Sequence, residues 1–290
     1  MIELNWIALT LFYGVASGVR NALRKKALTK SPLVEVLFLY TLLSFLLIAP
    51  VSLTSSSGEL IFADRSLYLI ILLKSLAVFV AWIFSFKSIG KMPVSFFGVV
   101  EMSGILFSTL FGIIFFNEKM GIYQWLGLLL VVLGVSAVNL KRDGEKGKAA
   151  LVPVLMLLTS CLFNSISGTM DKGIMARGDI TPGALQFWFM LCMTLLYLVY
   201  VIITKTHISL KTYIKNPLII IMSVIFVLGD RALFTANASP DSRVTVMILL
   251  KQSSVVASIL MGKLFFGEKH ILYRLLCAAL ITVGILTAAM

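Results

Sequence analysis

Long apolar runs recur along the whole chain and are separated by short polar breaks. A helix of about 20 apolar residues crosses the hydrocarbon core of a bilayer, and these runs have that length. They are blocks of Leu, Ile, Val and Phe rather than alternating segments, which favours helices over a membrane β-barrel. Because 59% of the residues are hydrophobic and the mean hydropathy is +1.01, little is left for a soluble domain. The sequence therefore predicts an all-α integral membrane protein.

Ten membrane spans are predicted from these runs. The first lacks the basic segment that precedes a cleaved signal sequence, so we expect it to be retained. The predicted spans are Leu4–Arg24, Pro32–Leu53, Leu67–Gly90, Pro93–Phe116, Met120–Leu140, Leu151–Ala176, Pro182–Thr204, Pro217–Ala238, Arg243–Phe266 and Ile271–Ala289.

The net charge of +12 could indicate nucleic acid or another acidic partner. Most of the Lys and Arg, however, lie at the ends of the predicted spans, and the basic loops follow the first, third, fifth and seventh spans, as in Arg24–Lys30 and Lys141–Lys148. Cytoplasmic loops carry such an excess of positive charge. We therefore expect these loops in the cytoplasm, both termini outside, the lipid bilayer as a partner and no nucleic acid.

The chain repeats itself at an interval of 150 residues without a gap. Ser31-Pro32 matches Thr181-Pro182, and Glu118-Lys119 matches Glu268-Lys269. The chain is therefore divided into two five-helix units, residues 1–140 and 151–290, with a hydrophilic linker at 141–150. Because each unit has an odd number of spans, the second enters the bilayer from the opposite side. Such an inverted repeat supports alternating access around a central site.

The five-plus-five spans and two sequence segments resemble the EamA-type family of the drug/metabolite transporter superfamily. The segments are FFNEKMGIYQWLGLLLVVLGV at Phe115–Val135 and FFGEKHILYRLLCAALITVGI at Phe265–Ile285, and the resemblance covers essentially the whole chain. The family's acidic-basic pair before the last helix of each half corresponds to Glu118-Lys119 and Glu268-Lys269. The resemblance implies transport of small organic solutes, such as amino acids, other metabolites or nucleotide sugars, through a central cavity. It also implies cytoplasmic termini, opposite to the orientation that the charges favour.

Glu101 lies in the middle of a predicted span, and the residue 150 positions later is Lys251. At about 1.5 Å per residue, Glu101 lies about 12 Å along its helix from Pro93, and inversion puts Lys251 at a similar depth. A charge at the bilayer centre costs about 3 kcal/mol, so such residues usually face a cavity or one another. We expect a zwitterionic solute to bind between the two residues; the alternative is a static ion pair.

Other polar residues share these helix faces or lie inside other spans. Ser108 lies on the expected face of Glu101, and Ser254 and Ser258 lie on that of Lys251. Asp230-Arg231 lies well inside the eighth span, where a lone carboxylate can carry a proton. Tyr13 is a candidate for the cavity wall. The predicted substrate-binding residues are Glu101, Lys251, Ser108, Ser254, Ser258, Asp230, Arg231 and Tyr13.

Several other charged residues are expected to have structural roles. Arg20, Lys87 and Asp171 lie near the ends of predicted spans, where side chains can reach the membrane interface. Glu118 and Glu268 precede a helix in each unit, and a carboxylate in the first turn of a helix is stabilised by the helix dipole.

The sequence contains no Gly-rich phosphate loop, no cluster of metal ligands and no nucleophile beside a histidine base. We therefore expect neither an enzyme nor an ATP-driven pump, and no cofactor or metal.

We expect a multi-pass protein of the cell membrane that transports a small polar organic solute, with an amino-acid-like or zwitterionic solute favoured. Protons or a counter-substrate would drive it. The alternatives are a transporter of organic anions or phosphorylated metabolites, and a membrane-embedded enzyme or accessory subunit. Because one chain holds both units, a monomer suffices, and a dimer is compatible with the sequence.

Overall fold

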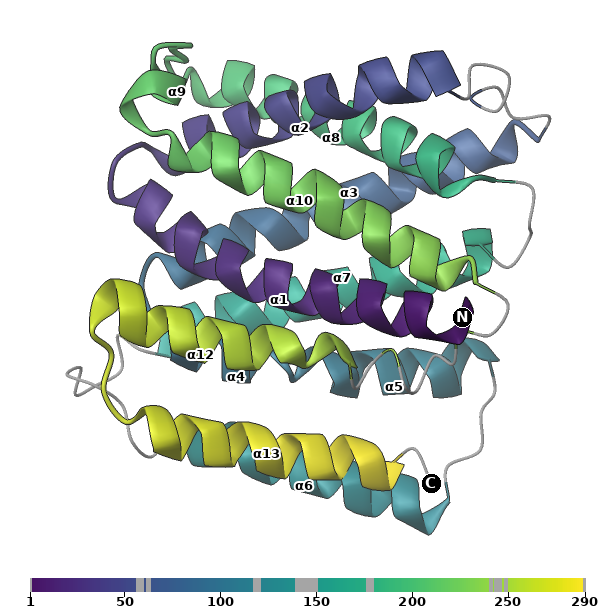
Figure 1. Cartoon of the computed structure of the whole chain (residues 1–290), viewed down its shortest axis with the longest axis vertical. Helices are drawn as coiled ribbons and strands as arrows, with labels where there is room; N and C mark the ends of the chain where they lie inside the picture. The colour runs from purple at the N-terminus through teal and green to yellow at the C-terminus, as the bar shows by residue number, and fades with distance from the viewer. Residues whose placement is uncertain are drawn as a thin grey trace.

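The computed structural model is a bundle of helices (Figure 1). It describes residues 2–55, 60, 64–116, 121–138, 151–175, 180–239, 242, 247 and 250–288. The described residues form helices and no strand, which confirms the all-α prediction. The helices are α1 (Ile2–Leu28), α2 (Leu33–Ser55), α3 (Ser66–Ile89), α4 (Val94–Glu101), α5 (Gly104–Phe116), α6 (Ile122–Val138), α7 (Leu151–Met175), α8 (Pro182–Thr204), α9 (Thr212–Lys215), α10 (Leu218–Asn237), α12 (Ser253–Phe266) and α13 (Ile271–Ala288).

Within the described ranges, five helices are long and apolar enough to cross a membrane, namely α2, α3, α7, α8 and α10. Shorter apolar stretches occur at Val94–Ser108, Trp125–Ala137, Ser253–Phe266 and Ile271–Thr287. Large side chains such as Ile202 are exposed on the outside of the bundle. A continuous apolar exterior of this kind suits hydrocarbon rather than water.

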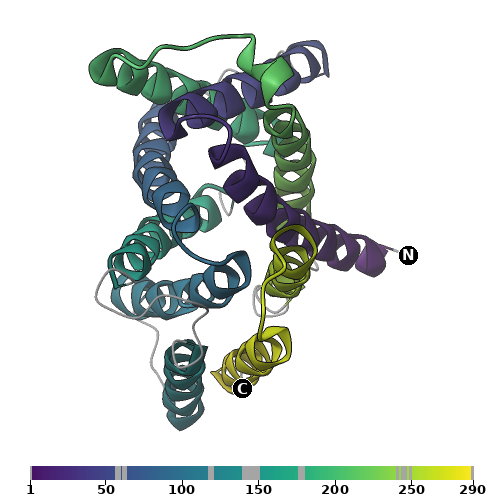
Figure 2. The same cartoon turned by 90° about the vertical axis from the view of Figure 1, so that its left-hand side faces the viewer.

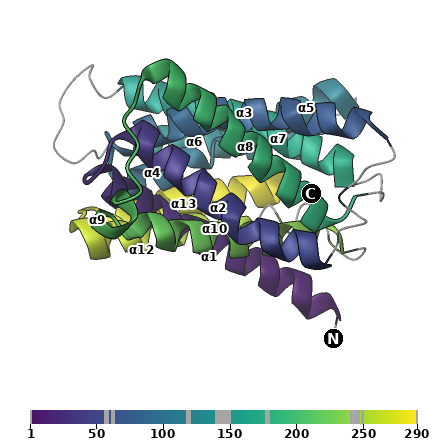
Figure 3. The same cartoon turned by 90° about the horizontal axis from the view of Figure 1, so that it is seen from above.

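The helix axes lie roughly parallel to one another, and successive long helices run back and forth along the bundle (Figure 1). Both chain ends lie at the same end of the bundle (Figures 1 and 3). Helix α1 lies between α10 and α12 and contacts both, with its second half enclosed by the bundle. Helix α3 contacts α7 and α8, and α2 contacts α8 and α10. Helices α6 and α13 pack on each other as a separate pair at one edge (Figure 2). Residues of α1 can therefore meet several other helices.

Small residues bring α12 close to its neighbours. A Cβ atom added at Gly18 of α1 would clash with the backbone of Ser254, and one added at Gly98 of α4 would lie 2.9 Å from the Cβ atom of Ser258. Close approach through small residues is typical of helix packing in membranes. Glycines on both α1 and α4 thus fix how α12 sits against them.

The helix that the sequence predicts across Pro93–Phe116 is interrupted. Helix α4 ends at Glu101 and α5 begins at Gly104. Between them, the Met102 N–H donates to the Val99 carbonyl over 3.2 Å, which is a tighter turn than an α-helix makes. A second turn at Gln252 separates Lys251 from α12. The prediction of an unbroken helix is therefore wrong in both places, and each break directly follows a charged residue.

Candidate functional site

Tyr13, Arg20 and Arg24 lie on one face of α1, because they are spaced by seven and four residues. Arg20 and Arg24 are only 6% and 5% exposed. The Arg20 guanidinium lies 4.9 Å from the centre of the Phe226 ring, and that of Arg24 lies 5.0 Å from the Phe86 ring. The prediction that Arg20 reaches the membrane interface is therefore wrong, because α1 is covered by neighbouring helices.

Aromatic rings from three helices line this part of the interior. Tyr40 of α2, Trp82 of α3 and Phe226 of α10 lie with ring centroids 5.4 Å apart in each pair. All three are buried. The three rings form an apolar wall beside the two arginines. The Tyr40 hydroxyl is the polar group of Tyr40 in this wall.

Glu101 is half-buried and accepts a hydrogen bond of 3.0 Å from Asn21 Nδ2 on α1. The same amide donates to Ser258 Oγ over 3.3 Å, and Arg24 Nη1 donates to Asn21 Oδ1 over 3.3 Å. One network thus joins α4, α1 and α12. Sequence reasoning missed Asn21 and assigned Arg24 to a basic loop; a buried polar pair three residues apart in the first span was the available signal.

Lys251 is half-buried and lies with its Nζ 5.9 Å from the centre of the Tyr13 ring. The carboxylates within its electrostatic reach are Asp171 and Asp230. In the described part of the chain, no ion pair joins Lys251 to Glu101. The static pair that the sequence allowed is therefore absent, and each residue has other neighbours.

Asp230 and Arg231 point to different surroundings although they are adjacent. Asp230 is 8% exposed and lies within electrostatic reach of Arg20 and Lys74. Arg231 is half-buried and lies against the start of α8, where a Cβ atom added at Gly183 would be 2.7 Å from Arg231 Nη1. Of the two, only Asp230 belongs to the charged interior.

Lys74 of α3 and Asp171 of α7 form an ion pair of 3.1 Å. Lys74 is 2% exposed, and its Nζ lies 3.7 Å from the centre of the Phe189 ring. The prediction that Asp171 reaches the interface is wrong, because Lys74 holds it inside the bundle. Lys87 is exposed, as expected.

The predicted serines mainly join helices. Ser108 donates to Ser165 Oγ over 3.1 Å, and Ser165 donates to the Gly104 carbonyl over 2.9 Å. Ser258 is fully buried between α1, α4 and α12, and it reaches Glu101 through Asn21. Ser254 is half-buried, with its backbone against Gly18.

Glu268, between α12 and α13, binds the start of α4. Its carboxylate accepts hydrogen bonds from Val94 N–H (2.6 Å), Ser95 N–H (3.0 Å) and the Ser95 hydroxyl. Arg274 is fully buried and donates to it over 3.0 Å, and Lys25 Nζ lies 3.9 Å away. The carboxylate thus meets a helix N-terminus, where anions are stabilised, but the helix is α4 and not its own α13. We call Glu268, Arg274 and Ser95 the latch; Glu118 lies outside the described residues.

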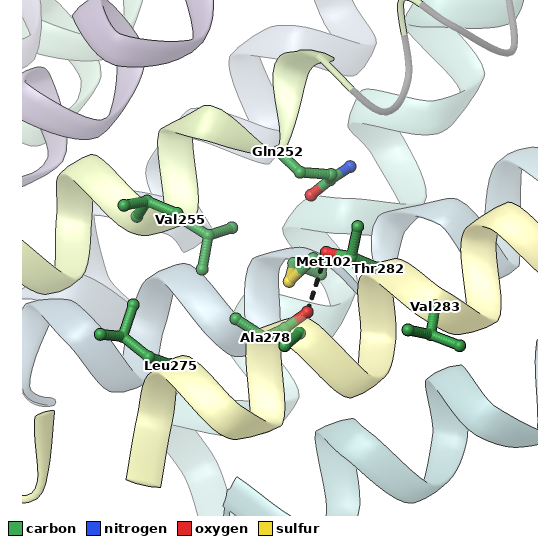
Figure 4. A pocket seen from close by; sticks show the side chains of 9 residues that line it. Met102, Gln252, Val255, Leu275, Ala278, Thr282 and Val283 are labelled. Carbon is green, nitrogen blue, oxygen red and sulfur yellow. Dashed lines mark hydrogen bonds between the residues drawn. The ribbon is translucent and has the colours of Figure 1, made fainter. Parts of the chain in front are cut away.

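A pocket of about 470 Å³ lies between α12 and α13. Met102 and Gln252, the turn residues at the two helix breaks, both line it (Figure 4). Within its wall, the Thr282 hydroxyl donates to the Ala278 carbonyl over 2.9 Å. None of the buried charges lines it, so this pocket is separate from the charged interior. Its lining residues are Met102, Gln252, Val255, Val256, Leu275, Ala278, Ala279, Thr282 and Val283.

In the parts of the chain that the structure describes, no group of three His, Cys, Asp or Glu side chains could hold a metal ion. The charged and aromatic side chains of the interior can bind a solute by ion pairing and ring contacts.

Comparisons with known proteins bear on the family and the fold. Residues 4–140 match the family model described as the EamA-like transporter family. The human UDP-N-acetylglucosamine transporter is 24% identical over 96 residues, which are 31% of this chain and 30% of that protein. The match thus spans less than a third of that relative. A crystal structure of a protein that is 16% identical covers 97% of this chain and 96% of its own, with a TM-score of 0.66, and shares the fold.

The expected resemblance is therefore confirmed over residues 4–140, which include the first of the two acidic-basic pairs. The family and the relative are transporters, so the alternative of a membrane-embedded enzyme is not supported. Residues 4–140 of the chain are thus similar to the EamA-like transporter family, and the long apolar helices are those of a multi-pass membrane protein.

Proposed function

We propose that the chain is a secondary active transporter of a small charged organic solute in the cell membrane, working by alternating access. One observation carries this proposal. Cations and carboxylates from α1, α3, α7 and α10 lie in the interior together with Glu101 and Lys251, the charged residues beside the two helix breaks. Ionisable groups inside a membrane protein are costly and mark solute pathways. Broken helices commonly form the central site of such transporters.

We also propose ten spans in two inverted units, residues 1–140 and 151–290, although the linker at 141–150 lies outside the described residues. Two features support this division. The helix breaks at Met102 and Gln252 are 150 residues apart. The contact of α1 with α10 becomes that of α7 with α3 when the units are exchanged, and both contacts occur. Rocking of one unit against the other would expose the site alternately, and a monomer would suffice.

The favoured solute is zwitterionic and amino-acid-like. Its amino group would bind Glu101, which is half-buried at the end of α4 and has a neutral partner, Asn21. Its acid group would bind the cations. One of these is Lys251, which lies beside Tyr13 of α1. Contacts with both units would differ between the two access states, and this difference would couple binding to rocking.

An organic anion is the second candidate, because two buried arginines and Lys251 outnumber the carboxylates near α1. The similarity to a transporter named for UDP-N-acetylglucosamine also favours it. Coupling to protons would place Asp230 as the proton carrier, whereas exchange with a counter-substrate would need no such residue.

Counterflow in proteoliposomes tests the proposal. Vesicles loaded with one solute of a panel of amino acids, organic acids and nucleotide sugars should take up the labelled form of the same solute. The double variant Glu101→Gln with Lys251→Met, which leaves neither charge alone, should fold and lose counterflow, while the exposed-site variant Lys87→Gln should keep it. No counterflow with any solute of the panel, or normal counterflow in the double variant, would contradict the function or the site, respectively.

A further inference from the structure

We infer that Arg20 and Arg24 form a subsite that binds the acid group of the transported solute. This inference rests on the proposed function and names the part of the solute that both candidate solutes share. We call the two arginines with Tyr40, Trp82 and Phe226 the arginine subsite.

Both guanidinium groups keep a buried donor without a partner. The Nε atoms of Arg20 and Arg24 have no hydrogen-bond partner, and both side chains are more than nine-tenths buried. Arg20 Nη2 donates to Ser17 Oγ and Arg24 Nη1 donates to Asn21 Oδ1, both over 3.3 Å, and the Tyr40 hydroxyl lies within reach of the Arg24 guanidinium. Buried polar groups are almost always satisfied in native structures. The two unpaired Nε donors therefore indicate a group that is not part of the chain.

Aromatic rings hold both arginines, while among the described residues the carboxylates of Glu101 and Asp230 lie within electrostatic reach without forming an ion pair with either. Arg20 lies over Phe226 at 4.9 Å, and Arg24 lies over Phe86 at 5.0 Å and Trp82 at 5.9 Å. Contacts with ring faces orient a guanidinium but leave its N–H edge available. That edge is the part of arginine that matches a carboxylate or phosphate in paired hydrogen bonds.

The charges near α1 are also unbalanced in favour of the cations. Lys74 and Asp171 neutralise each other as an ion pair of 3.1 Å. This leaves Arg20, Arg24 and Lys251 against Glu101 and Asp230 among the described residues of the interior. Neither arginine forms an ion pair with a carboxylate there. An acid group entering the subsite would remove the surplus positive charge.

The shape of the subsite adds a second requirement. Three rings with centroids 5.4 Å apart stand beside the guanidinium groups, and ring faces favour a planar or apolar group next to the acid. The ligand class is therefore a carboxylate or phosphate attached to a planar or apolar group, either in a zwitterion or in an organic anion.

The experiment compares benzoate with benzamide on the purified full-length protein in detergent. The two molecules have nearly the same shape, but only benzoate has a negative charge at neutral pH. Benzoate should raise the unfolding temperature as its concentration increases, because a ligand of the folded state stabilises it, and benzamide should not. Inorganic phosphate should compete with benzoate if the arginines accept either acid. Equal effects of benzoate and benzamide would overturn the inference.

Substitutions locate the binding. Arg20→Gln and Arg24→Gln should each weaken benzoate binding by at least tenfold, whereas Arg65→Gln, which removes an exposed arginine before α3, should leave it unchanged. If a Gln variant does not fold, the Lys variant replaces it; a lysine keeps the charge but loses the forked edge, so binding should still weaken. Unchanged benzoate binding in folded variants at both positions would refute the subsite.

Counterflow separates this inference from the proposed function. A solute exchanged equally well by the wild type and by folded variants of both arginines would leave the transporter proposal in place and overturn the subsite. Conversely, benzoate binding that depends on both arginines, in a protein that shows no counterflow with any solute, would support the subsite and contradict the proposed function.

Discussion

Replacing Glu268 by Gln should open one end of the helix bundle. The latch joins the loop before α13 to the start of α4 at the end of the bundle that holds the α1–α2 and α3–α4 connections (Figure 1). Because Glu268 belongs to one proposed unit and α4 to the other, this contact must break whenever the two units separate at that end. On the proposed division into two units this end is therefore closed, and Glu268 contributes to the closure.

The size of the effect follows from the contacts. The Glu268 carboxylate accepts from Val94 N–H, Ser95 N–H, the Ser95 hydroxyl and Arg274. Hydrogen bonds to a charged group contribute about 1.5–3 kcal/mol each, against about 0.5–1.5 kcal/mol for neutral pairs. Removing one charge of a buried pair costs about 3–5 kcal/mol, and Arg274 is fully buried. The amide retains part of the contacts, so we expect the closed state to lose about 3 kcal/mol, which is roughly a 100-fold change in the ratio of closed to open protein.

Thiol labelling measures this change. Ser258 is fully buried between α1, α4 and α12, so a single cysteine introduced as S258C, with the three native cysteines replaced, should react slowly with a water-soluble maleimide. Glu268→Gln should increase the labelling rate by one to two orders of magnitude, and Lys269→Gln, at the exposed next position, should not change it. Adding Arg274→Met removes the orphaned charge and should restore part of the protection. A labelling rate unaffected by Glu268→Gln would refute the reasoning.

Three further predictions follow from other contacts. Gly18→Ala should lower the free energy of unfolding by about 1–3 kcal/mol through overpacking against α12, whereas Gly168→Ala, the matched position 150 residues later with no atom within 4 Å, should not; equal thermal stabilities would contradict this. Lys74→Met should cost about 3 kcal/mol because it leaves Asp171 unpaired, and adding Asp171→Asn should recover most of the loss in thermal unfolding. Asp230→Asn should abolish solute accumulation driven by a pH gradient while solute exchange persists; accumulation at the wild-type rate would show that Asp230 does not carry the proton.

The sequence determined which segments become helices. Runs of Leu, Ile, Val and Phe bounded by polar or Pro residues predicted helices close to those observed, for example Pro32–Leu53 for Leu33–Ser55 and Pro182–Thr204 for α8. In a membrane the backbone must satisfy its hydrogen bonds within each segment, so an apolar run of sufficient length leaves few alternatives. The family resemblance, which the matched residues confirm, rested on the same local patterns.

The sequence also indicated that Glu101 and Asp230 lie inside the bundle, because a charge in an apolar run is costly unless it is enclosed. The spacing predicted the depth of Glu101 and Lys251 in the bilayer but not the direction of their side chains around the helix axes. Spacing alone therefore does not determine whether the two residues lie close together. The actual partner of Glu101 is Asn21.

Only the tertiary structure decided which charges are enclosed and what they contact. Arg20 and Arg24 lie near the end of an apolar run, where reaching the interface and turning inward are equally compatible with the sequence; the packing of α1 between α10 and α12 turns them inward. Glu268 likewise binds α4, which lies more than 170 residues away in the chain. These contacts depend on the rotation and close approach of helices, which are set by residues on other helices, such as Gly18 against Ser254, and so no local pattern specifies them.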